Sequence, residues 1–267
     1  MSQLIVSELN IYPVKSLGGI ALQRAEVERF GLHPDRRWMV VDANGRYLTQ
    51  REQSRMCLIQ PEPIDDGLRL RAPGMDALQL SHAPDMPSRE VTVWNDRVEA
   101  EDCGDEAARW LSRFLGIDCR LVHFLDHGQR AVDPAYARPG DVTAFSDGFP
   151  LLLITQASLD DLNGRLDEAV PMRRFRPNLV IAGSTPYAED TWKRLRIGDL
   201  TFRVAKPCSR CVITTIDPAT GERHPDAEPL RTLASYRMRN NKIYFGQNLI
   251  ADGEGRLAVG QAVEVIE

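Results

Sequence analysis

The sequence predicts a mainly β fold with α+β decoration, arranged as two β-barrel-like domains with a few short helices. Many short apolar runs are separated by Gly, Pro, Asn and Asp, a pattern typical of antiparallel barrels. Only a few segments repeat apolar residues at helical spacing. A stretch rich in Pro, Gly and charge over 126–148 shows no period and separates two strand-rich halves. We therefore expect one barrel domain over 1–124 and a second over 125–267.

The first half contains strand signals and one clear helix. Asn44-Gly45 is the strongest hairpin signal, so we expect the segment after it to return as a strand. Gly67 separates two further candidate strands. One helix face carries apolar residues at helical spacing, and Gly116 stands where a C-cap is expected: Ala107, Leu111, Phe114 and Leu115. The other expected strands cover 4–12, 38–42, 46–51, 91–94, 98–101 and 119–124.

The second half repeats this style after the long loop. Ser158 is expected to cap a helix in which Leu159, Leu162 and Leu166 share a face. A hairpin is expected to turn at Gly198-Asp199, and a second helix is expected over 230–239. The β-branched run over 212–216 predicts a strand. The remaining strands are expected over 151–155, 179–182, 243–250 and 257–266.

Composition and charge exclude several classes of protein. The chain of 267 residues has 43% hydrophobic and 27% charged residues, an ordinary globular balance. A general nucleic-acid binder is usually basic, whereas the net charge here is −5. The N-terminus lacks the basic start and apolar stretch of a signal peptide, and no apolar run is long enough to cross a bilayer. We expect a cytoplasmic protein without nucleic-acid or membrane partners.

The most unusual segment is Lys206-Pro-Cys-Ser-Arg-Cys211, with two thiols beside two cations. Nearby cations favour the thiolate, which is the form that binds metals. Ordinary buried cysteines are one alternative. Half of a zinc site is another, but no second pair of ligands stands at a suitable spacing. A thioredoxin-like dithiol would need a βαβ setting, whereas the following residues are expected to continue as a strand. Five sparse Cys residues do not indicate a disulfide framework.

Four further segments carry groups suited to an anion. Lys15 and Ser16 follow the first strand and precede two glycines, which let a ligand approach the backbone. Arg36 offers a guanidinium that can grip a phosphate bidentately. Arg176 and Asn178 lie two apart on an extended segment and so point to one side. The long loop ends in Ser146 and Asp147. Each segment alone is a weak signal, because most exposed Lys residues are simply solvated. The alternatives are a surface charge pair at Arg36 and a capped loop at 175–178. No Walker loop, dinucleotide-binding motif or zinc-hydrolase motif is present.

Taken in order, these segments resemble the MOSC family, named after the C-terminal domain of molybdenum cofactor sulfurase. The closest likeness is to the branch containing the mitochondrial amidoxime-reducing component and its bacterial relatives. The resemblance implies an N-terminal MOSC β-barrel domain followed by a MOSC domain. It extends over nearly the whole chain, in YPVKS (12–16), DRRW (35–38), LVHF (121–124), FRPN (175–178), YAEDTW (187–192), CSRCVITTIDPATG (208–221), EPLRTLASYR (228–237) and FGQN (245–248).

The resemblance also implies roles for individual residues. Cys211 matches the cysteine that ligates molybdenum, so it is both the expected catalytic residue and the expected metal ligand. Cys208 matches a family cysteine that does not bind the metal. The residues that match contacts of the molybdenum cofactor (Mo-molybdopterin) are Lys15, Ser16, Arg36, Ser146, Asp147, Arg176, Asn178, Ser209 and Arg210. Pyridoxal phosphate is not expected.

The implied reaction is reduction of small N-hydroxylated compounds (hydroxylamines, amidoximes and N-hydroxylated bases) to amines. The sequence shows neither a membrane anchor nor the cysteine run of a plant-type ferredoxin domain. We therefore expect a separate electron-donor protein of ferredoxin or flavoprotein type. Two alternatives stay open at this point. One is a carrier that holds the cofactor without turnover, and the other is a cysteine persulfide protein that transfers sulfur.

Overall fold

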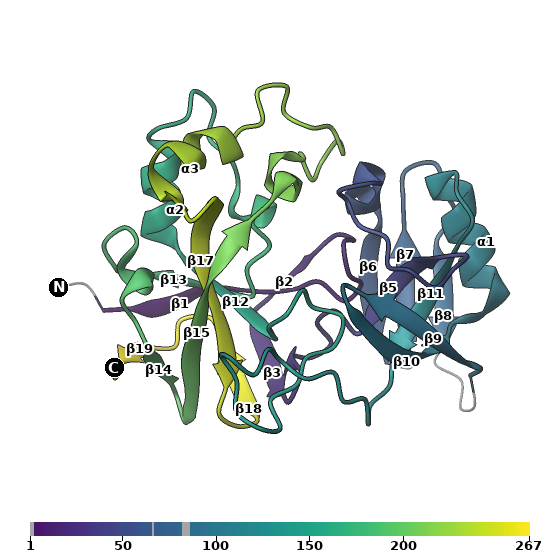
Figure 1. Cartoon of the computed structure of the whole chain (residues 1–267), viewed down its shortest axis with the longest axis horizontal. Coiled ribbons are helices and arrows are strands. Elements are labelled where there is room, and N and C mark those ends of the chain that lie inside the picture. Colours follow the sequence, from purple (N-terminus) through teal and green to yellow (C-terminus); the bar gives the residue numbers. More distant parts are fainter. Residues whose placement is uncertain (1–2, 66, 82–85) are drawn as a thin grey trace.

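The computed structural model describes residues 3–65, 67–81 and 86–267 and has a mainly β architecture (Figure 1). Its largest sheet has nine strands and combines the start of the chain with the second half. In spatial order the strands are β19 (Val263–Val265), β14 (Arg194–Ile197), β15 (Leu200–Arg210), β17 (Lys242–Ala251), β12 (Leu151–Thr155), β13 (Leu179–Ala182), β1 (Ile5–Ile11) and β2 (Ile20–Leu22), with β16 (Met238–Arg239) paired to β17.

This sheet curls until its two ends meet. Ile5 in β1 bridges Ala262 just before β19, and the amide of Val263 donates to the carbonyl of Leu4 at 2.9 Å. A short sheet of β18 (Gly255–Ala258), β3 (Arg24–Glu28) and β4 (Gly31–Leu32) packs its apolar residues into the same core. Closing the sheet in this way pairs the edges that an open sheet would leave exposed. The expectation of a barrel-like β fold is confirmed.

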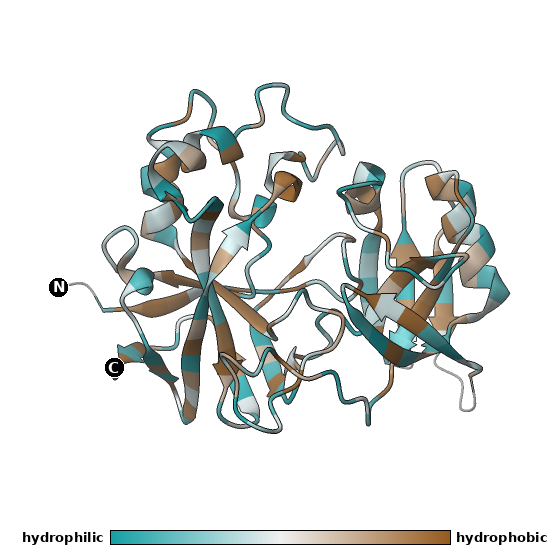
Figure 2. Ribbon diagram, in the orientation of Figure 1, coloured by the Kyte–Doolittle hydropathy of each residue, from teal (hydrophilic) through white to brown (hydrophobic). Residues whose placement is uncertain are grey.

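The central strand β12 shows why the sheet needs covers on both sides. Leu151 and Leu153 point into the barrel core, while Leu152 and Ile154 point to the opposite face. That outer face is covered by α2 (Gln156–Asn163) and α3 (Leu230–Arg237). A strand covered on both faces reads as a continuous apolar run rather than an alternating one. Figure 2 shows the contrast with other strands, along which hydrophobic and hydrophilic residues alternate.

The rest of the first half forms a separate packed body, seen at the right of Figure 1. The helix α1 (Gly104–Leu115) buries Leu111, Phe114 and Leu115 in the apolar core of this body. Gly116 ends the helix in the left-handed conformation, as expected. One sheet contains β5 (Trp38–Asp42), β11 (Cys119–Phe124), β10 (Asp96–Asp102) and β9 (Ser88–Val93), and the other contains β6 (Gln60–Ile64), β7 (Gly67–Arg71) and β8 (Leu78–Ser81).

Short 3₁₀ turns complete the fold: η1 (Ser54–Leu58), η2 (Met172–Arg174), η3 (Ala188–Asp190) and η4 (Val212–Thr215). The sequence predicted a strand over 212–216, and this prediction was wrong. The hydroxyl of Thr214 donates to the carbonyl of Cys211 at 3.0 Å, and that of Thr215 to the carbonyl of Val212 at 2.8 Å. These local bonds satisfy the tight turn and outweigh the β preference of the run.

Four other local expectations were also wrong. The segment after Gly45 forms only isolated bridges. The amide of Tyr47 donates to the carbonyl of Thr92 in β9, so the segment pairs with β5 over only a few residues. The cap of α2 is Thr155, since the hydroxyl of Ser158 instead donates to the buried carboxylate of Glu189 at 2.8 Å. That helix ends at Asn163, before the expected third apolar residue. The expected last strand is divided into β18 and β19.

The division into 1–124 and 125–267 stays a prediction. In space, β1 to β4 lie with strands from the second half of the chain. Within the described ranges, no helix has the length and apolar character needed to span a membrane.

Candidate functional site

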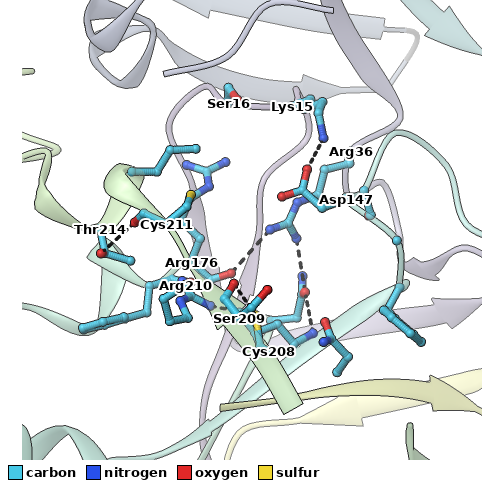
Figure 3. A pocket seen from close by; sticks show the side chains of 18 of the residues that line it. Lys15, Ser16, Arg36, Asp147, Arg176, Cys208, Ser209, Arg210, Cys211 and Thr214 are labelled. Carbon is cyan, nitrogen blue, oxygen red and sulfur yellow. Dashed lines mark hydrogen bonds and ion pairs between the residues drawn. The ribbon is translucent and has the colours of Figure 1, made fainter. Parts of the chain in front are cut away.

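One cavity brings together all ten residues that the sequence singled out. The cavity opens to solvent and lies where the end of β15 meets loops from the first half (Figure 3). Its lining includes Lys15, Ser16, Arg36, Ser146, Asp147, Arg176, Asn178, Ser209, Arg210 and Cys211. These residues come from five segments, which lie between positions 15 and 211 of the sequence. Their convergence is therefore a property of the tertiary structure.

Backbone hydrogen bonds fix the segments from the first half against one another. The amide of Lys15 donates to the carbonyl of Trp38 at 2.8 Å, and the amide of Arg36 donates to that of Tyr12 at 2.9 Å. The amide of Phe145 in turn donates to the carbonyl of Arg36 at 3.0 Å. The end of β1, the start of β5 and the exit of the long loop are thus held as one unit. Side chains from all three face the cavity.

Three lining residues have backbone conformations that side chains rarely adopt. Ser16, Arg36 and Arg176 have φ values of 65°, 49° and 57°, in the left-handed region. Such conformations cost free energy and persist where the surrounding structure imposes them, most often at functional sites. Here they turn a hydroxyl and two guanidinium groups toward one cavity. The sequence gives no local signal for this strain, since none of the three residues is Gly or Asn.

Two of the cations pack on the same buried ring. The guanidinium groups of Arg36 and Arg176 lie 4.5 and 4.1 Å from the ring centre of Tyr12. Burial raises the pKa of Tyr12 to about 12, so the phenol stays neutral. Burial and the neighbouring Arg36 lower the pKa of Arg176 to about 10. Burial acts the same way on Arg36, but its ion pair with Asp35 reverses the direction and raises the pKa.

Lys15 is buried and contacts the one carboxylate in the cavity lining. Its ammonium donates to the carbonyl of Phe145 at 2.9 Å and forms an ion pair with Asp147. Burial lowers the pKa of Lys15 below its ordinary value. Desolvation opposes ionisation of Asp147, but Lys15 and the nearby arginines outweigh it and hold the pKa of that carboxyl well below its usual range. The carboxylate of Asp147 is therefore ionised at neutral pH, and it contacts the Lys15 ammonium directly.

Cys211 lies at the junction of β15 and η4, where its thiol faces the cavity. Arg51 is its charged neighbour. Burial alone would lower the pKa of Arg51, but its interactions with the Cys211 sulfur and with Asp147 raise it above the ordinary value. Cys208 lies on the preceding strand and accepts a hydrogen bond from Arg210 at 3.0 Å. The two thiols thus have different cationic neighbours.

The charge and hydrogen-bonding state of the cavity favour a large polyanion. Among the described residues, the lining has five cations, Lys15, Arg36, Arg51, Arg176 and Arg210, against the single carboxylate of Asp147. Within the described residues, the buried Oγ of Ser146, Nη2 of Arg176 and Nε of Arg210 have no hydrogen-bond partner. Leaving a buried donor without a partner costs about 1–3 kcal/mol of free energy, so a ligand that offers acceptors to these groups would be stabilised. A ligand with phosphate and polar ring atoms fits this set of donors.

The described residues do not form a complete metal site at this cavity. No group of three or more His, Cys, Asp or Glu side chains in the described ranges could hold a metal ion by itself. A metal bound here therefore needs most of its ligands from a cofactor, with a soft thiolate such as Cys211 completing the set. This donor set matches a cofactor that brings its own dithiolene. It does not match a structural zinc site.

Asn178 has a different environment from the one expected. Its side-chain oxygen accepts from Arg36 Nη1 and from the amide of Leu152, each at 3.1 Å, and its amide donates to the carbonyl of Asn10. Most of its hydrogen-bonding capacity is used within the protein. Asn178 therefore positions Arg36 at the junction of β1, β12 and β13, and its direct contact with a cofactor stays a prediction. Ser209 is exposed on the cavity side of β15.

Sequence reasoning missed two arginines that shape the cavity. Arg51 ended the expected return strand of a hairpin and gave no signal beyond being one of many Arg residues. Arg130, in the long loop, is buried and donates to the carbonyls of Ala144 and Ser146 at 2.8 and 2.6 Å. It also pairs with Asp96 at 2.7 Å, which anchors the loop that carries Ser146 and Asp147. A signal for Arg130 was available, because a long ordered loop needs a partner for its inward-facing carbonyls.

Comparison with known proteins identifies two domains along the chain and several similar proteins. Residues 3–118 match the model described as the MOSC N-terminal beta barrel domain, and residues 140–264 match the MOSC domain. Mitochondrial amidoxime-reducing component 1 of Mus musculus is 38% identical over 98% of this chain and 82% of its own length. The protein of that name from Homo sapiens has the same identity and coverage. Mitochondrial amidoxime reducing component 2 of Bos taurus is 37% identical over 97% of this chain and 82% of its own length.

Proposed function

Because the chain belongs to the MOSC family, with both the N-terminal barrel domain and the MOSC domain, we propose that it is a molybdenum-cofactor-dependent oxidoreductase. Its proposed reaction is the reduction of N-hydroxylated compounds to amines. The amidoxime-reducing names of its relatives support this reaction class. The observation that carries the proposal is the convergence of five cations and the thiol of Cys211 on one cavity that opens to solvent.

The residues proposed to hold the cofactor divide by chemistry. Lys15, Arg36, Arg176 and Arg210 would neutralise its phosphate and polar oxygens, because charge-assisted hydrogen bonds are the strongest available to an anion. The free hydroxyl of Ser146 would donate to a heteroatom of the pterin. Cys211 would ligate the metal. When bound, the cofactor would supply the two-electron redox chemistry that side chains lack.

The overall reaction sets what the protein must provide. Reduction of R–NHOH to R–NH2 breaks the N–O bond, consumes two electrons and two protons, and releases water. Lys15 and Asp147 are held as an ion pair, so the two protons would come from water through the open side of the cavity. The electrons would come from a separate donor protein of ferredoxin or flavoprotein type. The substrate would enter through the open side of the cavity.

Metal analysis followed by a turnover assay tests this proposal. The full chain is produced in a host that makes the cofactor, its molybdenum is measured, and it is then given a chemical reductant and an N-hydroxylated purine. About one molybdenum per chain and release of the parent purine would support the reductase. Metal without turnover would instead indicate a cofactor carrier. Absence of metal, with a persulfide on a cysteine, would indicate sulfur transfer and overturn the proposal.

Localisation is a separate matter. The names of the relatives place those proteins in mitochondria. The cytoplasmic location expected from the sequence of this chain stays a prediction. Fractionation of the cells that naturally make the protein, followed by immunodetection, would test it directly.

A further inference from the structure

An exposed tryptophan stands beside the cavity. Trp94 occupies the first position of the two-residue turn between β9 and β10, where Val93 pairs with Asp96. Its φ is 57°, and its surface is 41% exposed. Hairpin turns that need a positive φ favour Gly, Asn or Asp, so a bulky ring at this position is costly. A strained backbone that leaves a large apolar ring in water suggests that the ring has a ligand.

Contacts with residues of the cavity hold this indole in place. Its Nε1 donates to Asp147 at 3.3 Å, and the guanidinium of Arg51 lies 4.7 Å from its ring. Asp147 and Arg51 both belong to the cavity lining, and Arg51 interacts with the sulfur of Cys211. Tyr47 supports the ring from the protein side, with ring centres 5.4 Å apart. The indole is therefore held in contact with Arg51, which itself interacts with the proposed metal ligand Cys211.

A second exposed aromatic ring lies next to the same loop. Tyr136 is 41% exposed and packs edge-to-face on Phe149, which lines the cavity two residues beyond Asp147. The ammonium of Lys206 lies 4.4 Å from the centre of the Tyr136 ring. Among the described residues, Trp94 and Tyr136 are the aromatic members of the set of large hydrophobic side chains that stay exposed. Both contact residues of the cavity lining.

We propose that Trp94 forms an aromatic wall at the substrate entrance and selects planar aromatic N-hydroxylated compounds over aliphatic ones. This inference rests on the function proposed above. A benzene or purine ring would pack against the exposed indole and place its N–OH group toward the interior of the cavity. Aromatic pairs gain free energy from both burial and ring geometry, whereas a methyl group in the same place buries far less surface. Tyr136 would add a weaker contact from the other side of the loop.

Two amidoximes that differ only in the attached group provide the test. Benzamidoxime carries a phenyl ring, and acetamidoxime carries a methyl group. In the holoenzyme with a chemical reductant, Trp94→Leu should lower the ratio of kcat/KM for benzamidoxime to that for acetamidoxime by about tenfold, the loss of one aromatic contact. Trp94→Phe keeps a ring and should retain most of the ratio. Met238→Ala, an exposed side chain outside the cavity lining, serves as the matched surface control.

A binding measurement without electrons separates this inference from the reductase proposal. Benzamidoxime is titrated into unreduced full-length protein while tryptophan fluorescence is followed. Quenching that vanishes in Trp94→Phe, with little effect of acetamidoxime, would support the aromatic wall even if no turnover occurred. Thermal unfolding of each variant confirms that the fold is intact. An unchanged substrate ratio in Trp94→Leu, or equal quenching in the wild type and Trp94→Phe, would overturn the inference.

Discussion

The guanidinium of Arg36 donates a hydrogen bond to the side-chain oxygen of Asn178 at 3.1 Å, across 142 positions of sequence. Asn178 also accepts from the amide of Leu152, so it ties the loop before β5 to the start of β12. This single amide therefore couples the two halves of the chain at the cavity. The cation it orients is one of the five that surround the proposed cofactor site.

Replacing the proposed metal ligand should affect metal content far more than replacing its neighbour. We expect Cys211→Ser to lower molybdenum per chain by at least about tenfold, because a neutral hydroxyl is a poor ligand for a soft site. Cys208→Ser should be milder, within about twofold, since it removes only a contact with Arg210. Elemental analysis and turnover of both variants provide the measurement. Equal losses in the two variants would point to dithiol or persulfide chemistry instead.

Removing a buried cation should weaken cofactor retention without unfolding the protein. Arg176→Ala deletes a guanidinium whose Nη2 has no partner in the described structure. Alanine also has a Cβ, so the backbone strain at φ 57° is unchanged. We expect about tenfold weaker retention, the loss of one charge-assisted hydrogen bond. The melting temperature of the apoprotein should change little, because relief of the repulsion from Arg36 offsets the lost hydrogen bond from Nη1 to the carbonyl of Leu17.

The matched control for this variant is Arg196→Ala. Arg196 lies on β14, where its exposed guanidinium pairs with Glu264 and contacts no residue of the cavity. Its molybdenum content should equal that of the wild type. Normal metal content in Arg176→Ala as well would remove Arg176 from the proposed set of cofactor contacts.

Arg51 should give Cys211 a preference for anionic reagents. The carboxylate of iodoacetate is attracted to a nearby guanidinium, whereas iodoacetamide is neutral. In the apoprotein, Arg51→Leu should lower the iodoacetate-to-iodoacetamide rate ratio at Cys211 about fivefold, which corresponds to about 1 kcal/mol of attraction. Mass spectrometry of the peptide that contains Cys211 provides both rates. Using the ratio cancels any change in the thiolate fraction of the cysteine. Arg97→Leu, a well-exposed residue on β10, should leave it unchanged.

Acid should remove a stabilising contribution in the first half of the chain. Burial opposes ionisation of Asp102, but hydrogen bonds from Arg120 and Gly104 and the charge of Arg89 outweigh it and lower the pKa. A carboxyl whose pKa is lower in the folded state stabilises the protein above its unfolded pKa, near 3.9. That contribution is lost as the pH falls through the folded-state pKa.

The variant Asp102→Asn tests this acid dependence. At pH 7 it should lower the free energy of unfolding by about 2–4 kcal/mol, because Arg89 loses its carboxylate partner and Arg120 keeps only Asp105. The difference from the wild type should shrink steadily below about pH 4. Urea titrations across this pH range measure it. Glu99→Gln, an exposed carboxylate on the same strand β10, is the control and should have little effect. A constant difference down to pH 2 would contradict the assignment.

Local sequence patterns predicted the main strands of both halves with the bounds that the structure has. The segments 38–42, 119–124, 151–155 and 179–182 form β5, β11, β12 and β13. Each is a short apolar run between turn residues, and that information lies within the segment itself. The helix ending at Gly116 was equally local. The family resemblance selected the cavity residues through motifs, because their separate chemical signals were weak.

Only the tertiary structure decided the arrangement of the site. The strand expected over 212–216 is a turn, in which two threonine hydroxyls donate to the carbonyls of Cys211 and Val212. Arg51 and Trp94 acquired their places from contacts with residues far along the chain, at 147 and 211. Apolar periodicity is a property of neighbours in sequence and can be read directly. The meeting of charges in a cavity depends on how the sheets close, and no single segment contains that information.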